Sequence, residues 1–481
     1  MLAIAPSVLR DKTKGCFPAP EKILCAAVEG AQVDFDTAQL IEARYFTELV
    51  VGQVAKNMIG TFWFQLNEIN AGRSRPQGLP AYTTRKVGVI GAGMMGAGIA
   101  YVSALAGIEV VLKDVSAEAA EKGKAYSAGL LDKKVARGQL SAQQRDAVLA
   151  RIAPSVADAD FAGCDLIIEA VFEDRALKGR VTAAAEACAL PEALIASNTS
   201  TLPITGLAQA VQQAEKFIGL HFFSPVDKMP LVEIIRGERT SDEALARAFD
   251  YVLQIRKTPI VVHDSRGFFT SRVFGTFTNE GIAMLGEGVS AAMIENQARQ
   301  AGMPVGPLAI ADEVSLSLME HIRRQTASDL AAEGRSAPEH PAFAVIDALL
   351  AAQRSGKAAG GGFYDYPQGG RKHLWPELKT RFEQAGAQIS AQDVRDRLLF
   401  IQAIETVRCV EEGVLISTAD ANIGSIFGIG FAAWSGGALQ FINQYGVRDF
   451  VARAQYLAEQ YGERFAPPAL LLEKAASGAR F

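Results

Sequence analysis

The stretch Lys86-Val-Gly-Val-Ile-Gly-Ala-Gly-Met-Met-Gly96 decides the fold of the region around it. Its first five residues form a short apolar run that predicts a buried strand, and the run 97–104 after it predicts a helix. Glycines 91, 93 and 96 stand at the join with G-x-G-x-x-G spacing. The spacing alone is a weak signal in a chain with 44 glycines. The strand before it and the helix after it give the context in which such a loop binds a dinucleotide pyrophosphate.

Asp114 adds a second element of the same site. It ends the next predicted strand, Glu109–Asp114, roughly 20 residues beyond the first glycine, where a carboxylate can accept hydrogen bonds from the adenosine ribose. The carboxylate would repel a 2′-phosphate, so we expect NAD rather than NADP. The alternative interpretation is an aspartate that caps the following helix.

Strands and helices alternate from about residue 84 to 265. Further apolar runs occur at 165–169, 193–197, 217–221 and 259–263, and helical stretches at 116–149 and 174–189 separate several of them. This alternation predicts an open, mostly parallel sheet covered by helices, that is, an α/β Rossmann-like domain.

After Arg266 the strand pattern stops, and an all-α region with an internal duplication is predicted. Arg272, Glu280 and Glu287-Gly-Val289 recur as Arg397, Glu405 and Glu412-Gly-Val414 at one constant offset. The alternative is coincidence between two amphipathic helices. We therefore predict four parts: a helical linker (1–83), the Rossmann domain (84–265) and two helical repeats (266–370 and 371–481). In the linker, residues 35–72 are expected to form one long helix.

The stretch from Gly219 to Ile235 reads as two apolar strands around a Pro-bounded turn. If the turn folds back, Glu233 on the second strand arrives beside His221 on the first, which is the pairing that a general base needs. The alternative is a core histidine satisfied by a chance acid.

Composition limits the classes of function. The chain has 481 residues, 21% of them charged, and a net charge of −5, which gives no general reason to bind nucleic acid or an anionic membrane. The five cysteines are scattered, so we expect reduced thiols, a cytoplasmic location and no metal site. We expect no transmembrane segment and no signal peptide.

With the glycine loop and the His/Glu stretch in hand, residues 84–480 resemble the NAD-dependent L-3-hydroxyacyl-CoA dehydrogenases of fatty-acid β-oxidation. They are most similar to the dehydrogenase part of the multifunctional α-subunit. The motifs that carry the resemblance are Gly91–Gly96, Asp165-Leu-Ile-Ile-Glu-Ala-Val-Phe-Glu173, Ala196-Ser-Asn-Thr-Ser-Thr-Leu202, His221-Phe-Phe-Ser-Pro225 and Pro230-Leu-Val-Glu233.

The resemblance implies the reaction and the residues that perform it. The reaction is oxidation of (3S)-3-hydroxyacyl-CoA to 3-oxoacyl-CoA by NAD, with His221 as base, Glu233 as its partner and Ser200 on the reacting oxygen. The implied cofactor contacts are Gly91, Gly93, Met95, Gly96, Asp114, Val171, Phe172, Glu173, Lys178, Ser200 and Ser224. Ser200 and Ser271 would contact the substrate. Glu173 and Lys178 could also form a solvated helix face.

Two positions depart from the family pattern, because Ser224 and Ser271 stand where these dehydrogenases commonly carry asparagine. A serine hydroxyl still makes a hydrogen bond but lacks the two donors of an amide. The contacts expected of Ser224 with cofactor and of Ser271 with the thioester are therefore the least specified part of the site.

Two other functions stay open: a dehydrogenase of small β-hydroxyacids, and a non-catalytic NAD-bound scaffold subunit of a fatty-acid oxidation complex. A thiolase subunit is a candidate partner, and a homo-oligomer is expected. In the fused α-subunits a hydratase domain precedes a linking helix, which residues 18–72 resemble. We expect no hydratase activity, because the hydratase core would lie upstream of Met1. The chain is then either a fragment of a longer product or a shortened protein.

Overall fold

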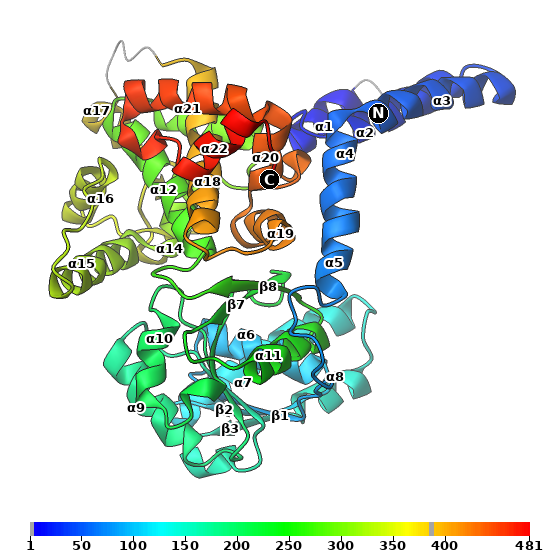
Figure 1. Cartoon of the computed structure of the whole chain (residues 1–481). Helices are drawn as coiled ribbons and strands as arrows, with labels where there is room; N and C mark the ends of the chain where they lie inside the picture. Colours follow the sequence, from blue (N-terminus) through cyan, green and yellow to red (C-terminus); the bar gives the residue numbers. More distant parts are fainter. Residues whose placement is uncertain (1–3, 384–388) are drawn as a thin grey trace. The chain divides into compact units, whose positions relative to one another are not determined.

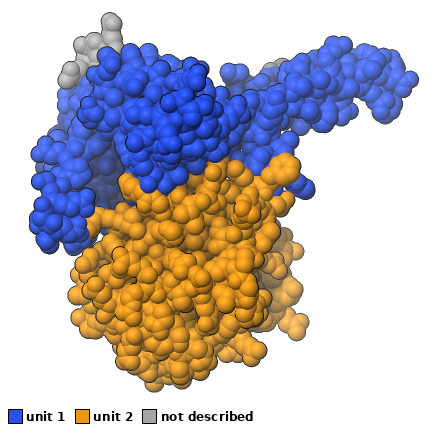
Figure 2. All heavy atoms as spheres, in the orientation of Figure 1, with its two compact units in different colours: residues 1–63, 272–411, 429–481 blue, residues 64–271, 412–428 orange. Residues whose placement is uncertain are grey.

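The computed structural model of the chain describes residues 4–383 and 389–481, and these residues form two compact units (Figures 1 and 2). Unit 1 comprises residues 1–63, 272–411 and 429–481, and unit 2 comprises residues 64–271 and 412–428. The predicted site residues from Gly91 to Ser271 all belong to unit 2.

Unit 2 is built on an eight-stranded sheet with the order β3-β2-β1-β4-β5-β6-β7-β8. The strands are Lys86–Ile90 (β1), Glu109–Lys113 (β2), Ile152–Ser155 (β3), Leu166–Glu169 (β4), Leu194–Ser197 (β5), Phe217–Phe222 (β6), Leu231–Arg236 (β7) and Thr258–His263 (β8). The first six strands run parallel, β7 is antiparallel to β6, and β8 is parallel to β7. The expected Rossmann-like sheet is confirmed, including the strand order 3-2-1-4-5-6 of dinucleotide-binding folds. Strand β3 was not expected, because Ile-Ala-Pro-Ser is too short and mixed to show a period.

Helices cover this sheet (Figure 1). They are Leu66–Asn70 (α5), Met94–Leu105 (α6), Ala117–Ala136 (α7), Ala142–Leu149 (α8), Arg175–Glu186 (α9), Ile204–Leu207 (α10) and Asp242–Gln254 (α11). Helix α6 is almost entirely buried. The helical stretch expected at 116–149 is two helices, since Ser141 caps a new helix with a complete capping box.

The strand register brings the site together. Ile90 of β1 is paired with Lys113 of β2 and with Glu169 of β4, and Glu169 is paired with Ser197 of β5. These strands are parallel, so the segments that follow them leave the sheet at one edge. Ligands bind at that edge in open α/β sheets.

Unit 1 is almost all helical. Its helices are Ala5–Thr13 (α1), Pro18–Gly30 (α2), Phe35–Val51 (α3), Gln53–Met58 (α4), Thr270–Gly286 (α12), Ala291–Gln300 (α13), Pro307–Val314 (α14), Leu316–Ala332 (α15), Ala342–Ala351 (α16), Glu377–Arg381 (α17), Ala391–Glu411 (α18), Thr418–Ile429 (α19), Ala438–Tyr445 (α20), Val447–Tyr461 (α21) and Ala469–Ser477 (α22). Two of these helices are shared with unit 2: Thr270 and Ser271 begin α12 inside unit 2, and α19 belongs to unit 2 except for its last residue, Ile429. Two short strands, Tyr364–Asp365 (β9) and His373–Leu374 (β10), correct the expectation of no strands after Arg266.

The recurring Arg and Glu residues pair across the two long helices of unit 1. Arg397 of α18, fully buried, binds Glu280 of α12 with 2.6 Å between Nε and Oε1. Arg272 of α12 binds Glu405 of α18 with 2.9 Å between Nε and Oε1. Each copy of the motif therefore supplies the partner of the other. The domain limits at 83, 265 and 370 stay predictions.

The N-terminal helices carry an unusual amount of exposed apolar surface. Helices α1, α2 and α3 contain no buried residue. On α3 the large apolar residues Phe35, Leu40 and Phe46 are 64–74% exposed. The single helix expected over 35–72 is wrong, because Gly52 adopts an extended conformation between α3 and α4 and a π-helical segment, Ile59–Gln65, precedes α5. Within residues 4–383 and 389–481, no helix has the length and apolar character needed to cross a bilayer.

Candidate active site

The hairpin of β6 and β7 brings His221 and Glu233 together. The antiparallel register places the two residues directly opposite each other, so their side chains leave the sheet on one face. His221 Nδ1 lies 2.9 Å from Glu233 Oε2. The predicted His/Glu pair is therefore present as a geometric fact, and its catalytic role stays a prediction.

Glu233 is held by more than the histidine. Its side chain is fully buried, and Oε1 accepts hydrogen bonds from the backbone N–H groups of Phe269 and Thr270, each at 3.0 Å. Oε2 accepts the hydroxyl of Thr270 at 2.5 Å. These backbone donors belong to the start of α12, whose positive end also stabilises a carboxylate. Glu233 is thus fixed in position by donors on both of its oxygens.

The partner fixes the tautomer of His221. An ionised carboxylate only accepts hydrogen bonds, so Nδ1 carries the proton and Nε2 has a free lone pair. The rings of Phe223 and Phe268 lie 4.5 and 6.3 Å from the imidazole, centroid to centroid. The side chain is 9% exposed, so the ring sits in a largely apolar environment at the edge of the unit. Such a ring can accept one proton at Nε2.

The glycine loop after β1 has the backbone geometry of a phosphate cradle. Gly91 has a φ of +95°, and a Cβ there would lie 2.7 Å from the carbonyl oxygen of Ala170, so the turn requires glycine. A Cβ on Gly96 would overlap the carbonyl oxygen of Gly91. Gly93, by contrast, faces open space at the N-terminus of α6, where backbone N–H groups lack partners within the helix. An anion can therefore approach at Gly93.

Asp114 sits beside this loop. Its Oδ2 accepts the backbone N–H of Ala92 at 2.6 Å, and Oδ1 accepts that of Val115 at 2.7 Å. Asp114 is not the cap of α7, which was the alternative interpretation, because Ser116 caps that helix. Asp114 therefore orders the glycine loop, and the remaining lone pairs of its half-buried carboxylate can accept hydrogen bonds from a ribose.

Lys178 and Glu173 do not form the solvated helix face that was one interpretation of them. Lys178 is 2% exposed, and its Nζ lies 3.0 Å from Glu169 Oε1 and 3.2 Å from Glu173 Oε2. Nζ also donates to the carbonyl oxygen of Val171, whose N–H donates to Glu169. The ammonium is therefore surrounded by protein acceptors. It holds the segment after β4 in place rather than projecting from it.

Glu173 is tied to the segment after β5. Its Oε1 accepts hydrogen bonds from the hydroxyl of Thr199 at 2.6 Å, from Ser200 N at 2.9 Å and from Thr201 N at 3.0 Å. Burial acts to raise the pKa of Glu173, but the charge of Lys178 and these hydrogen bonds outweigh it, so the pKa lies below its ordinary value. Glu173 is ionised and fixes the backbone on which Ser200 stands.

The turn between β6 and β7 lies next to the glycine loop. Ser224 Oγ is 3.6 Å from the sulfur of Met94, the first residue of α6. Lys257, the residue before β8, binds the same turn by donating to the carbonyl oxygens of Val226 at 2.6 Å and Met229 at 2.5 Å. The turn of the His221 hairpin and the dinucleotide loop are therefore neighbours.

The other predicted residues lie in the segments that follow β1 and β4 and at the start of α12. Met95 lies in the first turn of α6, Phe172 is 87% exposed after β4, and Ser271 is half-buried in the first turn of α12. Ser271 follows Thr270 directly, so it lies close to the His/Glu pair along the chain. The structure assigns no contact to these three that tests their roles.

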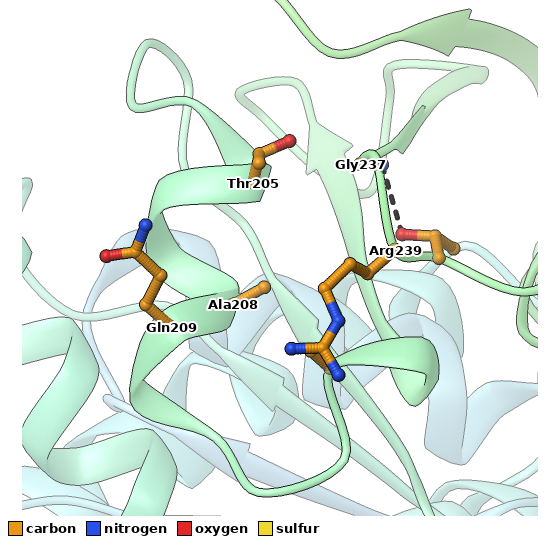
Figure 3. A pocket seen from close by; sticks show the side chains of 7 residues that line it. Thr205, Ala208, Gln209, Gly237 and Arg239 are labelled. Carbon is orange, nitrogen blue, oxygen red and sulfur yellow. Dashed lines mark hydrogen bonds between the residues drawn. The ribbon is translucent and has the colours of Figure 1, made fainter.

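A small pocket is lined by residues other than those predicted for the site. Seven residues line it: Thr205, Ala208, Gln209, Ala214, Gly237, Arg239 and Thr240. Figure 3 shows the Arg239 side chain beside it and the hydrogen bond from Gly237 N to Thr240 Oγ1. Its volume of about 30 Å³ is far below the several hundred Å³ of ligand sites, so it does not hold a cofactor. In the part of the chain that the structure describes, no three His, Cys, Asp or Glu side chains converge as metal ligands.

Comparison with known families decides the class. A family model described as "3-hydroxyacyl-CoA dehydrogenase, NAD binding domain" matches residues 86–265, and one described as "3-hydroxyacyl-CoA dehydrogenase, C-terminal domain" matches residues 267–366. The chain belongs to the 3-hydroxyacyl-CoA dehydrogenase family. As a member of this family it is an NAD-dependent oxidoreductase, and the family's substrate is a hydroxyacyl-CoA.

Solved structures of 3-hydroxyacyl-CoA dehydrogenases are similar to this chain. The (S)-3-hydroxybutyryl-CoA dehydrogenase of Ralstonia eutropha is 36% identical with a TM-score of 0.55, and the match covers 59% of this chain and 100% of that one. Two further structures show the fold alone. The 3-hydroxybutyryl-CoA dehydrogenase of Escherichia coli K12 is 24% identical (TM-score 0.69, 82% of this chain, 100% of that one). The dehydrogenase part of multifunctional enzyme 1 from C. elegans is 23% identical (TM-score 0.60, 87% and 99%).

The loop residues of this dehydrogenase suit the bound NAD that the family requires. The open side of Gly93 and the free N–H groups of α6 suit a pyrophosphate, and Asp114 suits an unphosphorylated ribose. Sequence reasoning missed three contributors: Glu169, Asn198 and Thr270. Glu169 binds Lys178 and Ser197, and Asn198 Oδ1 accepts the N–H of Phe222 beside His221. The signal available for all three was their position at the end of a strand or the start of a helix.

Proposed function

We propose that this chain oxidises (3S)-3-hydroxyacyl-CoA to 3-oxoacyl-CoA with NAD, as a step of fatty-acid β-oxidation, and that His221 paired with Glu233 is its general base. The observation that carries the proposal is the 2.9 Å contact of His221 Nδ1 with a Glu233 carboxylate that α12 holds in place. That contact leaves Nε2 of a neutral imidazole as the proton acceptor.

The proposed mechanism uses the residues in three roles. His221 Nε2 takes the proton of the C3 hydroxyl, and the carboxylate of Glu233 stabilises the imidazolium that forms. Ser200 binds the reacting oxygen, and Glu173 positions Ser200 through its N–H. Ser271 contacts the thioester from the first turn of α12. When bound, NAD supplies the hydride acceptor for C3.

The cofactor contacts are proposed from position. Gly91, Gly93, Met95 and Gly96 hold the pyrophosphate, and Asp114 holds the adenosine ribose. Val171, Phe172, Glu173, Ser200 and Ser224 line the edge of the sheet where the nicotinamide end would lie. Lys178 acts through Glu173, since its ammonium is enclosed by carboxylates and a carbonyl oxygen.

One assay tests the function. The purified chain is mixed with NAD and (3S)-3-hydroxybutanoyl-CoA, and NADH formation is followed. We expect turnover with the 3S ester, at least a hundredfold less with the 3R ester, and a strong preference for NAD over NADP. Turnover of a free small β-hydroxyacid instead of the CoA ester would favour that alternative. NAD binding without turnover on any of these substrates would favour a scaffold subunit.

We further propose a cytoplasmic homo-oligomer with a thiolase subunit as candidate partner. The support for the compartment is that the described residues contain five free cysteines, at 16, 25, 164, 188 and 409. Size-exclusion chromatography with light scattering tests the oligomer, and co-purification with a thiolase tests the partner. A monomer without thiolase would refute both.

A further inference from the structure

We infer that the hydroxyl of Thr270 is a positioning group for the base. It donates a hydrogen bond to Glu233 Oε2, the oxygen that also accepts His221 Nδ1–H, and so weakens the hydrogen bond between that oxygen and the imidazole. The inference rests on the proposed function for its catalytic consequence, and on the structure alone for the effect on His221. Thr270 is fully buried, and its Oγ1 donates to Glu233 Oε2 at 2.5 Å, the same oxygen that accepts His221 Nδ1–H at 2.9 Å.

The direction of the proton in the Thr270 contact is fixed by the acceptor. Glu233 has no proton to give, so the hydroxyl donates and its own lone pairs face elsewhere. Thr270 Oγ1 is also 3.4 Å from His221 Nδ1, which is long for a hydrogen bond beside the 2.9 Å contact to the carboxylate. The hydroxyl therefore acts on the imidazole mainly through Glu233.

Two donors on one carboxylate oxygen have a predictable effect. Each donor stabilises the negative charge locally, so less of that charge acts on the imidazolium that forms when His221 accepts a proton. Removing the hydroxyl leaves Oε2 to His221 alone, which favours the imidazolium and raises the pKa of His221. The backbone N–H of Thr270 still holds Oε1, so the carboxylate stays in place.

Other charged groups near the pair have partners of their own. Leu220, Phe222, Val232 and Ile234 belong to the apolar core with α11, so His221 and Glu233, which alternate with them, face the opposite side. The other titratable groups on β7 and β8, on the segment up to the first turn of α12 and on α19 are Arg236, His263, Asp264, Arg266, Arg272 and Asp420. Arg236 binds Asp242, His263 binds the carbonyl oxygen of Gly413, and Asp264 binds the backbone N–H groups of α10. Asp420 binds Ser74, and Arg272 binds Glu405.

The decisive variant is Thr270→Val, which replaces the hydroxyl by a methyl of the same shape. We expect the acid-side pKa of kcat/KM to rise by about 0.5–1 pH unit. Thr270→Ser keeps the hydroxyl and should superimpose on the wild-type profile. Thr276→Val serves as control on the same helix, since its hydroxyl donates to the carbonyl oxygen of Val273, three residues earlier. A Thr270→Val profile identical to wild type overturns the inference.

A second measurement separates this inference from the proposed function. The chain has five histidines, so the His221 imidazole can be followed by NMR in the protein without substrate, with His221→Gln identifying its signal. The His221 titration should move upward in Thr270→Val, or in Thr270→Ala if the valine variant does not fold. An unmoved titration overturns the inference even in an active enzyme. An inactive wild-type chain with a moved titration overturns only the proposed function.

Discussion

Gly96 lies against the carbonyl oxygen of Gly91, so closely that a Cβ on Gly96 would occupy the position of that oxygen. The first turn of α6 therefore packs directly on the loop that precedes it. Gly93, between them, has no heavy atom within 4 Å of the Cβ position. Gly91 and Gly96 are therefore required by packing within the protein, whereas Gly93 leaves space for a ligand to approach the backbone.

This difference predicts that the same substitution at Gly96 and at Gly93 impairs two different properties, stability and NAD binding. Gly96→Ala should destabilise the protein by about 3 kcal/mol or more, because the methyl overlaps backbone. Gly93→Ala should change stability by less than about 0.5 kcal/mol and weaken NAD binding about tenfold or more, because the methyl enters the space that a pyrophosphate needs. Urea unfolding and calorimetric NAD titration measure the two effects. A Gly93→Ala protein that binds NAD as tightly as wild type would contradict the assignment of the loop.

The glycine loop could be predicted from sequence because all of its determinants are local. A strand, three glycines, a helix and Asp114 lie within about 30 residues, the span of one βαβ unit. The surroundings of Lys178 could not be predicted in the same way. Its Glu169 partner ends a buried strand, and whether a lysine on α9 turns inward depends on packing that one helix period does not encode.

Replacement of His221 tests the base directly. His221→Ala should lower kcat by about 10²- to 10⁴-fold, the usual contribution of general base catalysis. NAD affinity should stay within about twofold, because the ring contacts Glu233, Phe223 and Phe268 rather than the glycine loop. Steady-state assays and NAD titration measure both. His321→Ala, at an exposed helical position, is the matched control. Full turnover in His221→Ala would exclude the assignment.

Replacement of Glu233 tests the pairing rather than the base. Glu233→Gln keeps an oxygen for the N–H groups of Phe269 and Thr270 but removes the negative charge beside the imidazole. The pKa of His221 should therefore fall, so the acid limb of the pH–rate profile moves to lower pH while kcat drops about 10²-fold. This shift is opposite in sign to that expected of Thr270→Val. An unshifted acid limb would show that Glu233 does not act on His221.

The His/Glu hairpin was predictable because one turn joins both residues, whereas the contribution of Thr270 was not. Glu233 and Thr270 meet only because α12 begins over the hairpin, a relation set by the tertiary fold. The same holds for Arg397 and Glu280. The sequence shows that their motif recurs, but not that each copy pairs with the other.

Lys257 should matter for stability through the hairpin turn. Its Nζ satisfies the carbonyl oxygens of Val226 and Met229, so Lys257→Met should cost about 1–3 kcal/mol by leaving both without a donor. Burial lowers the pKa of Lys257 from 10.5 to about 8. Between these values the unfolded chain binds the extra proton, so wild-type stability should gain a contribution as pH rises from 8 to 10.5. Urea unfolding at pH 7, 8, 9 and 10 measures this contribution. If the free energy of unfolding of Lys257→Met rises with pH as steeply as that of wild type, the prediction is refuted.

Asp420 predicts a pH dependence of the opposite sign. It is fully buried in α19, with Oδ2 accepting the hydroxyl of Ser74 and the N–H of Val261, and burial raises its pKa from 3.8 to about 7. Between those values the folded protein binds a proton that the unfolded chain does not, so this contribution to stability is complete below pH 4 and is lost as pH rises towards 7. Asp420→Asn should remove this loss of stability at higher pH, because the amide does not ionise, and it keeps an acceptor for Ser74. It should match wild type near pH 4 and exceed it at pH 8 by about 4 kcal/mol at most. Thermal unfolding at both pH values measures the difference, and Asp36→Asn, exposed on α3, controls for the lost charge. A stability difference that does not change with pH would show that Asp420 is ionised in the folded protein.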